Sequence, residues 1–308
     1  MHFYCVSGLS VGSDIALPGL IAMAADRGPP DVTIRHQPVP ATLEDTGAQG
    51  PTWQIAGNRF LLRIPDVARF LLSNGRDIVF EAEPGADPGD IPIFILGAAF
   101  GILLHQRERI VLHGSAVSVN GKAILFCGPS GAGKSTMAAV LAQRGFPLVT
   151  DDICAISVSS AGTPMVHPVG RQLKLWAQAI ERLDLAESRG EPVRNRLQKF
   201  YVAPGEAFSE ALPLGAVYAL REARPPHAPG IERPNVVDAA LILRRNAFRP
   251  LLVSRMGQKA NYFRAATTIA NVAGIFYLTR RLDFAAVADT IAALERHWLE
   301  IGLLEKAA

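Results

Sequence analysis

Cysteine is scarce in this sequence: Cys5, Cys127 and Cys154 are the only three among 308 residues. They lie far apart and form no C-x-x-C pair, which argues against a disulfide framework and against a zinc site built on cysteine. Unpaired thiols are typical of a reducing compartment, and the apolar residues around Cys127 and Cys154 predict that both are small core residues. We therefore expect neither a covalent cross-link nor a metal held by sulfur.

Charge is also sparse and nearly balanced, with 19% charged residues and a formal net charge of +3. No run of Lys and Arg alternates with aromatic residues, so the sequence lacks the basic surface typical of nucleic-acid-binding proteins. Hydrophobic residues make up 49% of the chain, which is enough for a sizeable core. We expect one large or two modest domains and no nucleic-acid partner.

No apolar run is long enough to span a bilayer. The longest, residues 91–104, is too short and is interrupted by glycines, so it favours a buried helix. Residues 1–5 contain no basic segment followed by a long apolar one, as a secretion signal does. We expect a cytoplasmic protein without a membrane partner.

What the sequence does contain is Gly128-Pro129-Ser130-Gly131-Ala132-Gly133-Lys134-Ser135, which matches the P-loop pattern G-x-x-x-x-G-K-[ST]. An apolar run at 123–127 precedes it, typical of a buried strand, and good helix formers follow at 136–142. Glycines let the backbone bend so that successive N–H groups point at phosphate oxygens, and the helix N-terminus adds partial positive charge. The alternative interpretation is a chance glycine- and serine-rich turn before a helix.

The motif predicts ATP and Mg²⁺ as ligands. Lys134 is expected to reach the β- and γ-phosphates, and the Ser135 hydroxyl is expected to bind Mg²⁺. The residues expected to contact ATP are Gly128, Ser130, Gly131, Ala132, Gly133, Lys134, Ser135 and Thr136.

Two units are expected, a β-rich unit at 1–88 and a P-loop unit at 89–308, because 83–89 is a cluster of turn residues rich in Pro and Gly. The expected strands of the first unit are 3–6, 31–35, 53–55, 59–64, 68–72 and 77–82, with a loop over 38–51. In the second unit we expect a helix over 92–106 and a strand over 110–120. The dipeptide Asn120-Gly121 then predicts a tight hairpin into the strand at 122–127. The P-loop strand is thus entered from an antiparallel neighbour, unlike the order of a Rossmann-type protein.

The remaining pattern predicts short strands alternating with helices. Expected strands are 148–149, 153–158, 165–167, 196–202, 214–220 and 275–278; expected helices are 173–185, 261–272, 285–298 and one starting with Asp238 as its N-cap. Residues 187–195 are expected to be a polar loop. We assign Trp176, Trp298 and most Phe residues to the core rather than to base stacking.

One series of short motifs resembles a known family. The run His113-Gly114-Ser115, the hairpin, the P-loop, Arg144-Gly145 and Thr150-Asp151-Asp152 follow in the order found in the catalytic domain of HPr kinase/phosphorylase and its kinase-only relatives. The resemblance covers about residues 109–157. It implies an α/β fold in which a core like that of phosphoenolpyruvate carboxykinase is joined to a small β-rich N-terminal domain.

The resemblance also implies catalytic roles. Asp151 would accept the proton of an incoming hydroxyl, Asp152 would bind Mg²⁺, and His113 would tune Asp151 or contact the transferred group, together with Lys134. Neighbouring residues of a strand point to opposite faces, so both carboxylates serve one site only if the strand ends or twists there. The alternatives are a helix cap and a surface carboxylate for the two Asp residues, and a hydrogen-bonded strand-end residue for His113. Four basic residues either neutralise phosphate charge or are solvated: Arg171, Lys174, Arg196 and Lys199.

The chain departs from the bifunctional enzymes after the Asp pair. Residues 168–175 lack the glutamate of their second signature, which argues against phosphorylase activity and against recognition of HPr itself. The N-terminal unit looks more like that of kinase-only relatives, including those that phosphorylate a serine of lasso-peptide precursors. A β-rich unit with an open strand edge would hold an extended peptide by strand addition.

The expected function is thus an ATP- and Mg²⁺-dependent kinase for a serine of a peptide or small protein, with a lasso-peptide precursor as the first candidate. The alternatives are an HPr-like carrier protein as acceptor, a small metabolite as acceptor, or an ATP-sensing module without transfer. The sequence is compatible with both a monomer and a homo-oligomer.

Overall fold

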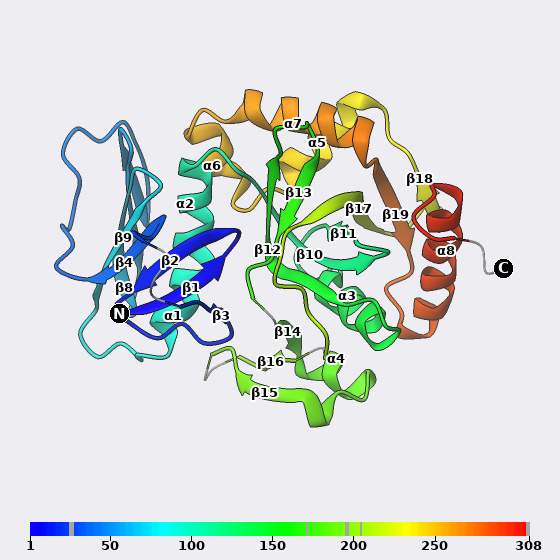
Figure 1. The fold of residues 1–308 in the computed structure, drawn as a ribbon, viewed down its shortest axis with the longest axis horizontal. Helices are drawn as coiled ribbons and strands as arrows, with labels where there is room; N and C mark the ends of the chain where they lie inside the picture. Colours follow the sequence, from blue (N-terminus) through cyan, green and yellow to red (C-terminus); the bar gives the residue numbers. More distant parts are fainter. Residues whose placement is uncertain (25–27, 171, 195–196, 204, 306–308) are drawn as a thin grey trace.

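The structure is a computed structural model that describes residues 1–24, 28–170, 172–194, 197–203 and 205–305. It is a mixed α/β protein whose strands form three sheets (Figure 1). Among the described residues, no helix has both the length and the apolar character needed to cross a membrane.

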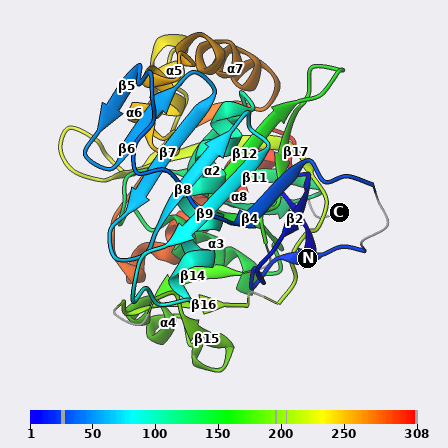
Figure 2. The same ribbon diagram turned by 90° about the vertical axis from the view of Figure 1, so that its left-hand side faces the viewer.

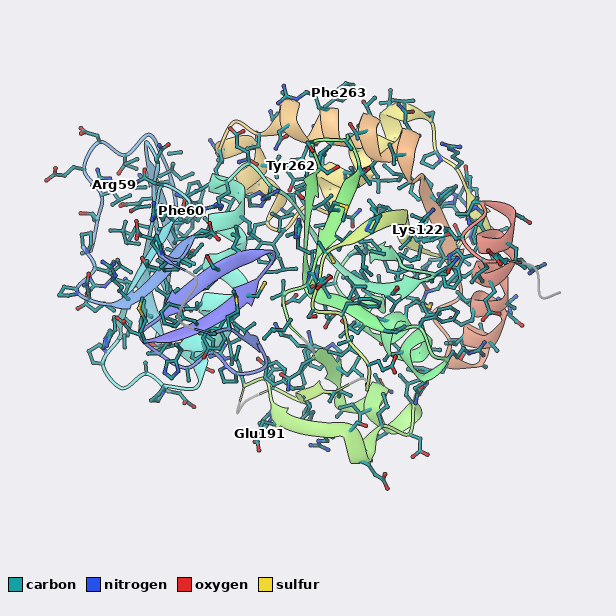
Figure 3. The ribbon with its side chains drawn as sticks, in the orientation of Figure 1. Arg59, Phe60, Lys122, Glu191, Tyr262 and Phe263 are labelled. Carbon is teal, nitrogen blue, oxygen red and sulfur yellow. The ribbon has the colours of Figure 1, made fainter. Side chains whose placement is uncertain are left out.

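The first sheet has nine strands in the order β3-β1-β2-β4-β9-β8-β7-β6-β5. They are β1 (His2–Val6), β2 (Leu9–Ser13), β3 (Ile21–Ala22), β4 (Val32–His36), β5 (Ala48–Gly50), β6 (Trp53–Ala56), β7 (Arg59–Ile64), β8 (Ala68–Ser73) and β9 (Asp77–Ala82). Its faces differ because side chains alternate along a strand. On β7, Phe60 is 1% exposed whereas Arg59 is exposed on the outer side (Figure 3).

A helical segment covers the inner face of this sheet. It consists of α1 (Asp90–Phe94), the π-helical segment η1 (Ile95–Ala99) and α2 (Phe100–Gln106), which confirms the helix predicted over 92–106. Figure 2 shows the sheet in front and α2 behind it. Ile95 and Phe100 are fully buried in one hydrophobic cluster with side chains of the sheet, so the segment and the sheet share a core.

The second sheet carries the P-loop and has seven strands in the order β11-β10-β12-β13-β17-β19-β18, with a further pairing of β11 with β17. The strands are β10 (Ile110–Val119), β11 (Lys122–Cys127), β12 (Leu148–Val158), β13 (Pro164–His167), β17 (Leu212–Glu222), β18 (Gly230–Glu232) and β19 (Ile275–Arg280). The predicted hairpin is confirmed, because Val119 pairs with Lys122 around Asn120 and Gly121, whose φ angles are 47° and 73°. Such positive φ angles at both central residues are what a tight hairpin turn requires.

Helices cover both faces of the second sheet (Figure 1). They are α3 (Lys134–Gln143), α5 (Val236–Arg245), α6 (Pro250–Arg255), α7 (Lys259–Val272) and α8 (Val287–Glu300), the last preceded by a 3₁₀ turn, η3 (Phe284–Ala286). Residues of α3 and α8 pack in one cluster with Phe126 and Tyr218, whereas α5 and α7 pack in another with Leu125 and Val217. Because neighbouring residues of β11 and β17 enter different clusters, the sheet is buried on both sides, as its apolar sequence indicates.

The third sheet is small and lies beside the P-loop helix (Figure 1). Its order is β14-β16-β15, with β14 (Leu173–Trp176), β15 (Arg189–Pro192) and β16 (Lys199–Val202). A short helix, α4 (Ala177–Arg182), and a 3₁₀ turn, η2 (Ala186–Ser188), connect β14 to β15.

Several sequence predictions are wrong in this part of the chain. The helix predicted over 173–185 is a strand followed by the shorter α4, because Leu173 and Leu175 are buried while the residues between and after them point away. The loop predicted over 187–195 contains the last two residues of η2 and all of β15, and residue 195 lies outside the described residues.

Three further boundaries also differ from expectation. The loop predicted over 38–51 contains the edge strand β5, and the two short strands predicted around Asp151 are one strand, β12. Asp238 is not the N-cap of its helix: Asn235 is, and its side chain accepts a hydrogen bond from the Asp238 amide.

Candidate active site

The P-loop lies between the end of β11 and the first residue of α3. Its glycines have positive φ angles, 153° at Gly128, 81° at Gly131 and 80° at Gly133. A side chain on these residues would strain the backbone, so glycine lets the chain turn sharply and enter the helix at Lys134. The loop and the helix N-terminus together form a cradle suited to an anion.

Lys134 is held by its own loop. Its side chain is nearly buried, and Nζ donates to the carbonyl oxygens of Gly128 and Pro129, each at 3.0 Å. Burial lowers the pKa of this ammonium, with the neighbouring carboxylates opposing the effect. A phosphate would offer this ammonium charged partners in place of carbonyl oxygens.

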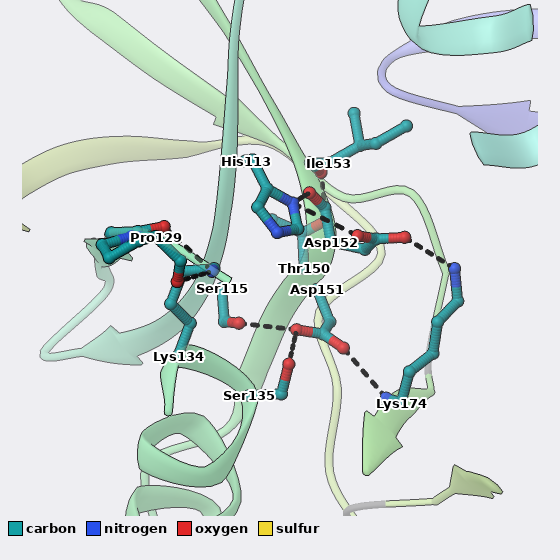
Figure 4. A network of polar contacts seen from close by, with 11 residues as sticks. His113, Ser115, Pro129, Lys134, Ser135, Thr150, Asp151, Asp152, Ile153 and Lys174 are labelled. Carbon is teal, nitrogen blue, oxygen red and sulfur yellow. Dashed lines mark hydrogen bonds and ion pairs between the residues drawn. The ribbon is translucent and has the colours of Figure 1, made fainter. Parts of the chain in front are cut away.

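Asp151 lies opposite the start of α3 and accepts three hydrogen bonds (Figure 4). Its Oδ1 accepts from the hydroxyls of Ser115 at 2.5 Å and Ser135 at 2.8 Å, and its Oδ2 accepts from the amide of Lys174 at 2.9 Å. These bonds join β10, the P-loop helix and β14 to one carboxylate, which is only 9% exposed. The bond to Ser135 brings the expected Mg²⁺ ligand and the first carboxylate of the pair into contact.

Asp152 points into the same site because the strand is distorted at this residue. Its φ angle is 73°, in the left-handed region that Asp adopts more readily than most residues. The side chain accepts from Lys174 Nζ at 2.8 Å, and its Oδ1 lies 3.3 Å from His113 Nδ1 (Figure 4). The same His113 nitrogen lies 3.0 Å from the carbonyl oxygen of Asp152. The twist required for two adjacent carboxylates to serve one site is therefore present.

Asp152 and Lys174 each stabilise the ionised form of the other. Burial by itself raises the pKa of Asp152, but the Lys174 ammonium and His113 outweigh it and hold that pKa far below its ordinary value. Burial by itself lowers the pKa of Lys174, but Asp152 outweighs it and the pKa is raised. Asp152 is thus a carboxylate with a fixed cationic partner, whereas Asp151 is bonded to hydroxyls and an amide.

A cavity of about 150 Å³ connects these groups. It is lined by His113, Ser130, Gly131, Gly133, Lys134, Ser135, Thr136, Asp151, Asp152, Lys174, Trp176 and Lys199, among others. Gly128 and Ala132 line a different, larger cavity behind the loop. Most of the residues predicted to hold phosphate and metal therefore surround one space, and their roles stay predictions.

The prediction for Trp176 is wrong. Its side chain is 54% exposed at the cavity, and Lys199 Nζ lies 5.9 Å from its ring centroid, whereas Trp298 is fully buried as predicted. Arg171 and Arg196 lie outside the described residues.

The sequence pattern assigned no role to Ser115 in this network, and for Lys174 it indicated only the alternatives of neutralising phosphate charge or being solvated. Ser115 is part of the motif that carries the resemblance, but nothing in the pattern indicated a bond to Asp151. Lys174 contacts both carboxylates, Asp151 by its amide and Asp152 by its ammonium, and only the alternation along β14 could have indicated its orientation.

The site offers few protein ligands for a metal ion, which is compatible with Mg²⁺. Among the described residues, no three His, Cys, Asp or Glu side chains converge as a metal-binding group. Mg²⁺ is nevertheless often held by one or two protein oxygens together with phosphates and water. Ser135 Oγ and the carboxylate oxygens of Asp152 are such oxygens, and both residues line the same cavity beside the cradle.

Comparison with known proteins gives a consistent but partial match. The family model described as HPr Serine kinase C-terminal domain matches residues 105–181, which include the P-loop and both Asp residues. The HPr kinase/phosphorylase of Lachnoclostridium phytofermentans is 49% identical over 55 residues, covering 18% of this chain and 18% of that protein. That of Limosilactobacillus reuteri is 34% identical over 98 residues, covering 29% and 31%.

A third relative, the HPr kinase/phosphorylase of Exiguobacterium sp., is 29% identical over 120 residues, covering 36% of this chain and 37% of that protein. The HPr(Ser) kinase/phosphatase structure from Coxiella burnetii aligns with a TM-score of 0.35 and 10% identity, over 62% of this chain and 92% of that one. The chain thus matches between 18% and 37% of the length of these curated relatives.

Proposed function

We propose that this chain is an ATP- and Mg²⁺-dependent serine kinase of an HPr kinase-like family, on the premise of the match of residues 105–181 to the HPr Serine kinase C-terminal domain. The acceptor is a serine hydroxyl of a peptide or small protein. The observation that carries the proposal is the 2.8 Å hydrogen bond between Ser135 of the P-loop helix and Asp151 of β12. It joins the phosphate cradle to the carboxylate pair, as transfer of a terminal phosphoryl group requires.

The P-loop would hold the β- and γ-phosphates through its amides, and Lys134 would exchange its two carbonyl partners for phosphate oxygens. Bound Mg²⁺ would supply charge neutralisation at the phosphates, with Ser135 and one carboxylate of the pair as protein ligands. The nucleotide-binding core would resemble that of phosphoenolpyruvate carboxykinase. Residues 89–308 would form the catalytic unit and residues 1–88 a β-rich unit beside it.

Asp151 is the better candidate for the base. Its Oδ1 already accepts hydrogen bonds from two hydroxyls, Ser115 and Ser135, so the hydroxyl of an acceptor serine would meet the same acceptor oxygen. In the transfer step the serine oxygen bonds to the γ-phosphorus, the bond from that phosphorus to the ADP oxygen breaks, and the serine proton passes to Asp151. Asp152 would serve the metal after exchanging Lys174 as its partner, and His113 would orient Asp152.

A second, narrow cavity of about 50 Å³ also reaches the two Asp residues and suggests where the acceptor enters. Its walls include Pro18, Ile93 and Leu96 from the N-terminal half of the chain and Tyr201 from β16. A passage of this size suits one side chain carrying a hydroxyl, which supports a peptide or protein acceptor. A lasso-peptide precursor is the first proposed acceptor.

An HPr-type small protein is the second proposed acceptor, because the relatives matched over residues 105–181 are named HPr kinase/phosphorylase. The absence of the signature glutamate from residues 168–175 supports a kinase without phosphorylase activity. We propose no nucleic-acid or membrane partner for this protein.

The test is transfer from ATP and Mg²⁺ to serine-bearing peptides and to an HPr protein, with phosphoserine measured by mass spectrometry. Asp151→Asn should lower transfer by about 10²–10⁴-fold, the range typical of losing a general base, while ATP binding persists. Asp289→Asn, at an exposed position in the first turn of α8, is the matched control and should transfer at the wild-type rate. Full transfer by Asp151→Asn would show that the base is assigned wrongly.

A further inference from the structure

A larger cavity of about 460 Å³ lies behind the P-loop, on the side away from Asp151 and Asp152. One wall is the loop itself, Gly128 to Ala132, and the others are the ends of β17 and β19 and the last turn of α5. Ser130 and Gly131 line both this cavity and the one that contains the carboxylates. The loop is therefore a shared wall, and a ligand that crosses it would enter both cavities.

The strand arrangement gives the two cavities different characters. β17 pairs in parallel with β11, and β19 pairs in parallel with β17, so all three strands end at the edge where the P-loop begins. β12, which carries the Asp pair, lies on the opposite side of β10. Ligands of open α/β sheets bind at the carboxyl ends of parallel strands. The edge formed by β11, β17 and β19 is such a place.

Arg280 makes this cavity unusual. Its side chain is 7% exposed, and Nη2 donates to the carbonyl oxygen of Ala132 at 2.7 Å. Among the described residues its Nε has no hydrogen-bond partner and no carboxylate forms an ion pair with the guanidinium. A buried cation without an anion is costly, so the arrangement suits a ligand that brings negative charge.

The P-loop sequence accommodates this arginine. A Cβ at Gly133 would lie 2.4 Å from Arg280 Nη2, so any other residue at this position would have to displace the guanidinium from its place beside the loop. The contact places a fixed positive charge against the backbone that cradles phosphate. It lies on the β19 side of the loop, whereas Lys134 and Ser135 face the carboxylates.

The rest of the cavity suits a flat, polar ring system. Leu220 and Ile242 supply apolar surface. The guanidinium of Arg221 lies over the ring of Tyr277, with Cζ 4.4 Å from the ring centroid. Asn246 Nδ2 donates a hydrogen bond to the carbonyl oxygen of Ile242, and the side-chain oxygen of Asn246 can accept one from a ligand. A volume of about 460 Å³ is typical of a site for a small organic ligand.

We propose that this cavity holds the base and ribose of the nucleotide and that Arg280 binds the phosphate next to the ribose. The assignment rests on the proposed function, because it requires a nucleoside triphosphate at the P-loop. The nucleotide then spans the loop, with its γ-phosphate at Asp151 on one side and its nucleoside between β17, β19 and α5 on the other. The rival position for the base is the exposed ring of Trp176.

The experiment compares two probes, the ATP analogue AMPPNP and inorganic tripolyphosphate, by calorimetry in the presence of Mg²⁺. Wild-type protein should bind AMPPNP at least about tenfold more tightly, because only AMPPNP carries the nucleoside. Tyr277→Ala should remove most of that difference and leave the Kd for tripolyphosphate within about twofold. Losing a ring from such a contact typically costs about tenfold in affinity.

Arg280→Gln should weaken both probes by about tenfold or more, since a charge-assisted bond to phosphate is lost. Arg281→Gln, an exposed neighbour, is the matched control and should bind both probes as the wild type does. If AMPPNP binds but Tyr277→Ala and Arg280→Gln leave it unchanged, the pocket assignment is overturned and the kinase proposal survives. The same holds if Trp176→Leu, and not Tyr277→Ala, removes the nucleoside contribution. No binding of AMPPNP to the wild type would overturn both proposals.

Discussion

Replacing Lys174 by methionine tests the charge network at the centre of the site. Lys174→Met keeps the length and apolar stem of the side chain but removes the ammonium that lies 2.8 Å from Asp152. The carboxylate is then left with His113 as its remaining neighbour, at 3.3 Å. We therefore expect a loss of folding stability that depends on the ionisation of Asp152.

The magnitude follows from the burial of the pair. Removing one partner of a fully buried ion pair costs about 3–5 kcal/mol. Here the side chains are 19% and 26% exposed and His113 remains, so we expect the free energy of unfolding to fall by about 2 kcal/mol at pH 7. For a chain of 308 residues that corresponds to a decrease in Tm of about 3 °C.

The pH dependence has a definite sign. The pKa of folded Asp152 is lowered, so the stability it contributes is present above the unfolded pKa of about 3.9 and is lost as the pH falls through the folded pKa. The pKa of Lys174 is raised, so its contribution is present below the unfolded pKa of about 10.4 and is lost at higher pH. The difference between wild type and Lys174→Met should therefore persist from about pH 6 to 9 and shrink on acidification below about pH 4.

The assay is urea unfolding from pH 3 to pH 8 with a chelator, so that no divalent cation contributes. Lys174→Met in the Asp152→Asn background should cost less than about 0.5 kcal/mol, because the carboxylate charge is already gone. Lys122→Met, at an exposed position of the hairpin, is the control and should change stability by less than about 0.5 kcal/mol. A penalty for Lys174→Met that is the same at pH 3 and pH 7, or the same in both backgrounds, would refute the reasoning.

Two further variants test the scaffold and the loop. Tyr262→Phe removes the hydroxyl that accepts from the Val111 amide at 3.0 Å and donates to the Val111 carbonyl at 2.9 Å. The free energy of unfolding measured in urea should fall by about 1–3 kcal/mol. An unchanged urea midpoint would show that these two hydrogen bonds do not stabilise the fold. Gly133→Ala places a Cβ 2.4 Å from Arg280 at a φ of 80° and should weaken AMPPNP binding by about tenfold or more in calorimetry; wild-type affinity would show that the loop adjusts freely.

The P-loop and its surroundings could be predicted because their signals are local. The turn at Asn120 and Gly121, the glycines of the loop and the helix that follows depend on residues within a few positions of each other. The antiparallel entry to the P-loop strand followed from that hairpin alone. The same is true of the helix at 92–106, whose apolar run is long enough to identify.

The orientation of the site residues depends on contacts between distant segments. The sequence raised the question of whether Asp151 and Asp152 serve one site, but the positive φ of Asp152 that answers it arises within a strand. Lys174 bonds to both carboxylates, although it lies 22 positions after Asp152 and 23 after Asp151. No local pattern predicts such a pairing.

The mistaken elements share a physical cause. Residues 173–185 carry apolar residues at spacings that suit either a helix or a strand, and pairing with β16 decides for a strand up to Trp176. The same pairing leaves Trp176 exposed beside Lys199, although its size favours a core position. Short edge strands such as β5 and β15 form because a partner strand is present, which composition alone does not indicate.

The most direct test of the central claim is the structure of the protein bound to AMPPNP and Mg²⁺. We expect the γ-phosphorus to lie against Lys134, with room for an acceptor oxygen ~3–3.5 Å from it and within hydrogen-bond reach of Asp151. A structure in which the nucleotide lies in the P-loop while the carboxylates of Asp151 and Asp152 are out of reach of that position would contradict it.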